Sequence, residues 1–141
     1  MLRIDFHSKV PNKLGYACRL VRKARAANCR VVLFSDDRAQ LKLLDEALWT
    51  FSDLDFLPHV MADDALASDT PILLAHDDRV ALPHHQILIN LSTITPGNFT
   101  QFERMFEIVS TDAADTAAGR ERYRQYHQQG YPLTNHQAEG T

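Results

Sequence analysis

The hydrophobic residues of this chain follow two spacings, one typical of strands and the other typical of amphipathic helices. Residues 2–7 alternate apolar and polar side chains, and residues 30–34 carry a run of β-branched and aromatic ones, so both segments predict strands. Between them, apolar residues three and four positions apart predict a helix over about residues 11–28. Ser35-Asp36-Asp37 then offers capping side chains for a second helix over about residues 37–50.

The second half of the chain predicts further elements of the same two kinds. Strands are expected at residues 71–75, 86–91 and 106–109, a short helix around Phe99, Phe102 and Met105, and a last helix from near Asp112 to a C′ glycine at Gly130. Alternating strands and helices predict an α/β fold, as a single Rossmann-like domain with a mostly parallel central sheet and helices on both faces. The acidic stretch 53–69 predicts no regular element. We expect the domain to span residues 1–136, followed by a frayed tail over residues 137–141.

Composition narrows the function classes that this fold allows. Hydrophobic residues make up 45% of the 141 residues and charged ones 23%, which predicts an ordered globular domain rather than a disordered chain. The formal net charge of -3 argues against direct binding of nucleic acid by the chain as a whole. No apolar run approaches the roughly 20 residues of a membrane-spanning helix, and the start of the chain does not resemble a signal peptide. We therefore expect a cytoplasmic protein that does not bind a membrane.

The sequence offers no recognisable catalytic site. Residues 7–15, which follow the first strand, contain one late glycine and a proline instead of a phosphate-binding loop, and neither glycine-rich nucleotide motif occurs elsewhere. Asp36 and Asp37 stand where a carboxylate could bind a ribose, but helix capping accounts for them. No G-x-S-x-G turn is present, and Cys18 lies on the inward stripe of its helix. We expect no nucleotide, no other cofactor and no intrinsic activity.

The sequence also gives little support for a disulfide bond or a metal site. Cys18 and Cys29 lie 11 positions apart, about 16 Å along a helix, so we expect two separate thiols in a reducing compartment. One polar loop gathers five possible zinc ligands, His76, Asp77, Asp78, His84 and His85. Their spacing matches no established zinc site, so a solvated loop without a metal ion is the better interpretation.

Two groups of residues favour binding to other proteins. The first is the only tryptophan, Trp49, at the end of a predicted helix and shortly before Phe51 and Phe56. Large aromatic side chains at a helix end are common interface anchors, although they can equally cap the domain's own core. The second group is one face of the last helix, formed by Arg120, Tyr123, Arg124 and His127. It suits a carboxylate beside an apolar group, although a phosphate or solvent alone would also fit.

Four segments, in this order, resemble the chi subunit family of the bacterial DNA polymerase III holoenzyme. They are Leu-Asp-Glu-Ala-Leu-Trp at 44–49, Phe-Leu-Pro-His at 56–59, Ile-Leu-Ile-Asn-Leu at 87–91 and Arg-Glu-Arg-Tyr at 120–123. Each segment alone is a weak signal, but the ordered set is specific and covers nearly the whole chain.

The resemblance implies a non-catalytic accessory subunit of the clamp-loader complex, with a Rossmann-like fold and no nucleotide. It implies two partners: a small psi subunit, through Trp49 and Phe56, and the acidic, Phe-terminated C-terminal tail of single-stranded-DNA-binding protein. The residues implied for the tail site are Val109, Arg120, Tyr123 and Arg124. One departure is Thr116, where the family often has a lysine; the tail site would then be weaker, or another cation would substitute.

Two other function classes remain as alternatives. One is an orphan cytosolic enzyme with a degenerate nucleotide-binding fold, which would need loop chemistry that the sequence does not offer. The other is direct nucleic-acid binding through residues 120–124 and the basic face of the first helix, which the net charge disfavours.

Overall fold

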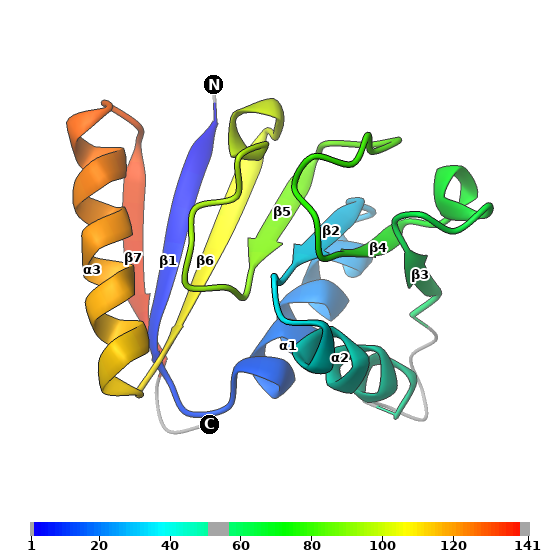
Figure 1. Ribbon diagram of the computed structural model, residues 1–141, viewed down its shortest axis with the longest axis horizontal. Helices are drawn as coiled ribbons and strands as arrows, with labels where there is room; N and C mark the ends of the chain where they lie inside the picture. The colour runs from blue at the N-terminus through cyan, green and yellow to red at the C-terminus, as the bar shows by residue number, and fades with distance from the viewer. Residues whose placement is uncertain (1, 51–56, 139–141) are drawn as a thin grey trace.

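A computed structural model describes residues 2–50 and 57–138 of the chain. Seven strands of this part form one sheet in which every neighbouring pair is parallel, in the order β3-β4-β2-β5-β6-β1-β7 (Figure 1). The strands are β1 (Arg3–Val10), β2 (Val31–Phe34), β3 (His59–Met61), β4 (Ile72–Ala75), β5 (Ile87–Asn90), β6 (Arg104–Ser110) and β7 (Leu133–Gln137). The structure thus confirms the predicted α/β fold.

Three α-helices of the described residues cover the two faces of the sheet. They are α1 (Lys13–Ala26), α2 (Arg38–Thr50) and α3 (Ala113–Gln128). Helices α1 and α2 pack against one face, and α3 covers β6 and β1 on the other (Figure 1). Each helix begins at a capping side chain: Asn12 accepts a hydrogen bond from an N–H of α1, Asp37 from α2 and Asp112 from α3.

The central strands are buried on both faces, as their apolar runs predict. In β2, Val31 and Leu33 join the core beneath α1 and α2, whereas Val32 and Phe34 join the core on the α3 side. Successive side chains of a strand point to opposite faces, so one four-residue strand contributes to two cores.

The expected short helix around Phe99, Phe102 and Met105 is wrong. A single 3-10 turn spans Phe99–Gln101, and Met105 is fully buried in β6, which already begins at Arg104. All three apolar side chains pack into or against the core on the α3 face, but from a turn and a strand. Their spacing of three therefore imitates a helical stripe.

The sheet ends in two strands, β3 and β7, at positions where the sequence predicts none. β3 has only three residues within the acidic stretch and pairs with β4. β7 pairs with β1 and has mostly exposed polar side chains, so backbone hydrogen bonds define it. β7 ends at Gln137, and the N–H of the next residue, Ala138, donates to the backbone carbonyl of Ser8.

His7 introduces a pH dependence of stability. Its ring is buried on the α1 side of β1, where Nδ1 hydrogen-bonds the Tyr16 hydroxyl and the ring stacks on His136. Burial, and secondly the nearby His136, lower the pKa of His7 to about 4.

We expect acid to destabilise the fold well above the range of ordinary carboxyl titration. The unfolded chain protonates His7 near pH 6.5, whereas folded His7 stays neutral down to about 4. Its contribution is thus complete above pH 6.5 and lost as pH falls toward 4, up to about 3 kcal/mol. Burial lowers the pKa of His84 too, which adds to the loss. Urea denaturation at several pH values should show a flatter pH dependence for His7→Phe than for wild type; equal slopes would contradict this.

Candidate functional site

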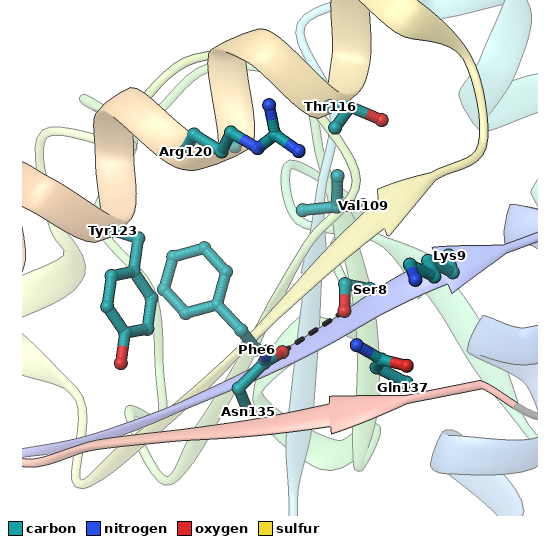
Figure 2. A pocket seen from close by; sticks show the side chains of 10 residues that line it. Phe6, Ser8, Lys9, Val109, Thr116, Arg120, Tyr123, Asn135 and Gln137 are labelled. Atoms are coloured by element: carbon teal, nitrogen blue, oxygen red, sulfur yellow. Dashed lines mark hydrogen bonds between the residues drawn. The ribbon is translucent and has the colours of Figure 1, made fainter.

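A pocket lies between α3 and the strands β6, β1 and β7. Its volume is about 310 Å³, at the small end of the range for ligand sites. It is lined by Phe6, Ser8, Lys9, Val109, Thr116, Gly119, Arg120, Tyr123, Asn135 and Gln137. Figure 2 shows Thr116 and Arg120 on the helix, Ser8 and Lys9 on β1, and Phe6 and Val109 between them.

The floor of the pocket is apolar. Phe6 and Val109 are buried side chains of β1 and β6, and the half-exposed Tyr123 ring stands edge-on to Phe6 with 5.1 Å between ring centroids. Gly119 allows α3 to approach β6 closely here, because a Cβ at this position would lie 2.7 Å from Cγ2 of Val109. The glycine therefore lets α3 pack directly on the Val109 side chain at the pocket.

Two cations stand beside this floor. Arg120 projects from α3 and Lys9 from β1, and both side chains are exposed. In the described part of the chain neither cation forms a hydrogen bond or an ion pair, so their charges are available to a ligand. An apolar floor with two unpaired cations suits an anionic ligand that also carries an apolar group.

A buried polar network fixes the position of α3. The Arg122 guanidinium donates to both carboxylate oxygens of Glu107 on β6, at 3.2 and 3.1 Å, and to the Thr93 carbonyl at 2.8 Å. The Tyr126 hydroxyl and the Asn90 amide also donate to Glu107, at 2.6 and 2.9 Å. Burial, and secondly the Glu107 charge, raise the pKa of the Tyr126 phenol. This network orients the adjacent turn, from which Arg120 and Tyr123 reach the pocket.

The start of α3 is anchored separately. Asp115 accepts a hydrogen bond from the Ser110 N–H at 2.7 Å and pairs with Lys13 of α1 at 3.0 Å. Burial alone would raise the pKa of this carboxyl, but Ser110 and Lys13 outweigh burial and hold it below its usual value. Thr116 lines the pocket, and its hydroxyl donates to the Ser110 carbonyl.

Three of the four residues expected at the tail site, Val109, Arg120 and Tyr123, line this pocket together. Arg124 is not among the lining residues; its side chain is 66% exposed and its guanidinium donates to Glu121 at 2.9 Å. The sequence interpretation missed the lining residues of β1 and β7. It predicted no strand at 133–137, so no signal placed Asn135 and Gln137 beside the last helix.

Trp49 lies at the end of α2, a helix that contributes no residue to the pocket. Its side chain is 53% exposed, and its ring centroid lies 4.3 Å from that of the buried His59. Trp49 therefore packs on the surface and does not fill the core. Leu43 on α2 and Met61 on β3 are exposed as well. Phe56, the second aromatic expected on this side, lies outside the described residues.

Three of the five candidate metal ligands contact other side chains of the protein. His76 hydrogen-bonds Arg38, Asp77 binds Arg79, and the His85 ring packs edge-on to Phe102. Within residues 2–50 and 57–138, no three His, Cys, Asp or Glu side chains lie close enough to hold a metal ion.

Cys18 is buried in the α1 core, and burial raises the pKa of its thiol to about 11. A thiol with that pKa is a poor nucleophile at neutral pH. Among residues 2–50 and 57–138, no helix combines the length and the hydrophobicity that a membrane span requires.

These features define a class of protein: a Rossmann-like α/β domain with a surface pocket between its last helix and the sheet edge. The family model described as "DNA polymerase III chi subunit, HolC" matches residues 1–134. The DNA polymerase III subunit chi of Pseudomonas aeruginosa is 36% identical over 96% of each chain. That of Haemophilus influenzae is 30% identical over 84% of this chain and 82% of its own, and that of Escherichia coli 28% over 82% and 79%. The chain belongs to the DNA polymerase III chi subunit family.

Proposed function

We propose that this chain is a non-catalytic, cytoplasmic accessory subunit of the clamp-loader complex. It bridges a psi subunit and the C-terminal tail of single-stranded-DNA-binding protein, and it needs no cofactor. The observation that carries the tail assignment is the pocket itself, whose apolar floor of Phe6, Val109 and Tyr123 lies beside Arg120 and Lys9. A peptide that ends in phenylalanine and carries acidic residues presents the matching chemistry.

The proposed binding mode follows from the position of each group. The terminal phenylalanine ring packs on Val109 and against the Phe6–Tyr123 ring pair, where aromatic contacts are favourable. The terminal carboxylate pairs with the Arg120 guanidinium, which can bind it through two parallel hydrogen bonds. Exposed ion pairs contribute only about 0.2–1 kcal/mol each, so the expected dissociation constant is roughly micromolar. Salt should weaken binding, because the two cations are exposed.

The decisive experiment is a titration of the Arg120→Ala variant with an acidic, Phe-terminated peptide. We expect about 10-fold weaker binding or more, because Arg120 makes a two-point hydrogen bond to the carboxylate, and hydrogen bonds to charged groups contribute about 1.5–3 kcal/mol, more than a simple exposed ion pair. Arg124→Ala should weaken binding less, because Arg124 already pairs with Glu121. Arg79→Ala, in a loop that does not line the pocket, is the matched control and should bind as wild type does.

Two further measurements sharpen the test. A peptide that lacks the terminal phenylalanine should show almost no binding, and 0.5 M salt should weaken binding of the complete peptide. Equal binding by Arg120→Ala and wild type, or by the two peptides, would reject the tail site.

The psi subunit is proposed to bind on the other side of the chain, through Trp49 and Phe56. The exposed Trp49 supports this assignment, because large aromatic side chains are common interface anchors, and Leu43 and Met61 add exposed apolar side chains on α2 and β3. The two sites use different elements, α3 with β1 for the tail and α2 for psi, so both partners can bind at once.

A further inference from the structure

Strand β1 contains a bulge at the pocket. Its register with β6 shifts between His7 and Val10, so that Ser8 and Lys9 together lie opposite Val109. Two residues opposite one is the definition of a β-bulge, and its extra residue resets the alternation of side chains. Ser8 and Lys9 consequently both line the pocket on the α3 side, while Val10 enters the core beneath α1.

The bulge imposes an unusual backbone conformation on Lys9. Its φ is 56°, in the left-handed region that glycine adopts easily and that lysine adopts only at a cost. The neighbouring Ser8 is held twice by the β7 segment, because its hydroxyl donates to Asn135 at 3.1 Å and its carbonyl accepts from the Ala138 N–H at 2.9 Å. Strained backbone of this kind concentrates at functional sites.

Lys9, the residue with this strained backbone, carries a positive charge. Lys9 and Arg120 are the only charged residues that line the pocket, and neither has an ionic partner in the described part of the chain. Thr116 adds only a hydroxyl, which is already bonded to Ser110. In Figure 2, Lys9 lies at the end of the pocket opposite Tyr123. A ligand anchored by a ring at Tyr123 and by a carboxylate at Arg120 would therefore pass Lys9 as it leaves the pocket.

We propose that the β1 bulge positions Lys9 as the second ligand-binding cation of the pocket, which pairs with acidic side chains upstream of a terminal phenylalanine. The proposal rests on the proposed tail-binding function and adds a residue to it. Arg120 binds the terminal carboxylate of the ligand, and Lys9 binds acidic side chains upstream of it, so the two cations recognise different parts of one ligand.

The first test is the variant Lys9→Gly, which removes the charge and retains a residue that favours a positive φ. We expect two- to fivefold weaker binding of the acidic, Phe-terminated peptide, the size of about one exposed ion pair. The melting temperature should not fall, because glycine relieves the backbone strain. Lys9→Asn, which also tolerates this conformation, should behave in the same way. Lys23→Ala, on the opposite face of the sheet, is the matched control and should bind as wild type does.

A second peptide identifies what Lys9 binds. It keeps the terminal phenylalanine and its carboxylate, but its upstream acidic residues are replaced by their amides. Lys9→Gly should bind this peptide as tightly as wild type, whereas Arg120→Ala should still weaken it. If Arg120→Ala weakens the acidic peptide and Lys9→Gly does not, the role of Lys9 is rejected and the tail site stands. If wild type binds neither peptide, the proposed function and the role of Lys9 both fail.

Discussion

Replacing Arg122 with alanine is expected to lower the free energy of unfolding by about 3–5 kcal/mol. The Arg122 side chain is almost fully buried, and it is the only cation bonded to the fully buried Glu107 among the described residues. Its removal leaves a carboxylate in the core without its charge partner. Urea denaturation measured by circular dichroism at pH 7 gives the loss directly, as a lower midpoint with an unchanged slope.

A neighbouring arginine supplies the control for this experiment. Arg124 lies two residues further along α3, but its ion pair with Glu121 is exposed, so Arg124→Ala should change stability by about 0.5 kcal/mol or less. Similar losses from the two substitutions would show that the buried network does not hold α3.

A double substitution tests whether charge or packing matters more in this network. In Arg122→Met with Glu107→Leu, no charge is left buried, so part of the lost stability should return. Full recovery is not expected, because Tyr126 and Asn90 would lose their common acceptor.

The two arginines also show where sequence interpretation reaches its limit. Arg120, Arg122 and Arg124 occur at alternate positions of one helix, and positions two apart do not share a helix face. Arg120 and Tyr123, which the periodicity places on one face with Arg124 and His127, both line the pocket, whereas Arg124 and His127 are not among the lining residues. It does not reveal that Arg122 is buried, because its partner Glu107 lies on a strand whose own pattern reads as apolar. Only the packing of α3 on β6 brings the two charges together.

The strands also differ in whether the sequence predicts them. β2, β4 and β5 are predictable because both of their faces are buried, which requires unbroken apolar runs. β7 is not predictable, because its side chains are mostly exposed and backbone pairing with β1 defines it. Three of the ten lining residues therefore escaped the sequence analysis for structural reasons: the two on β7, and Lys9, whose direction depends on a bulge that leaves no hydrophobic signal.

Trp49→Ala is expected to weaken binding of a psi subunit by about 2 kcal/mol or more, which is roughly 30-fold in the dissociation constant. An interface would bury the exposed half of the indole, and alanine removes that area together with the contact to the His59 ring. The melting temperature should change little, because the side chain does not fill the core. Isothermal titration of purified psi subunit into each variant measures the effect.

Val80→Ala is the matched control for Trp49→Ala, since Val80 is an exposed apolar side chain in a different loop and should not affect psi binding. The same Trp49 variant should bind the acidic tail peptide as wild type does, because α2 contributes no residue to the tail pocket. A variant that melts at a much lower temperature yet binds psi normally would assign Trp49 to the stability of the α2–β3 region. A variant that loses both partners would mean that the two surfaces are coupled through the sheet. Retained stability and tail binding, combined with loss of psi alone, is the result that a two-sided bridging subunit requires.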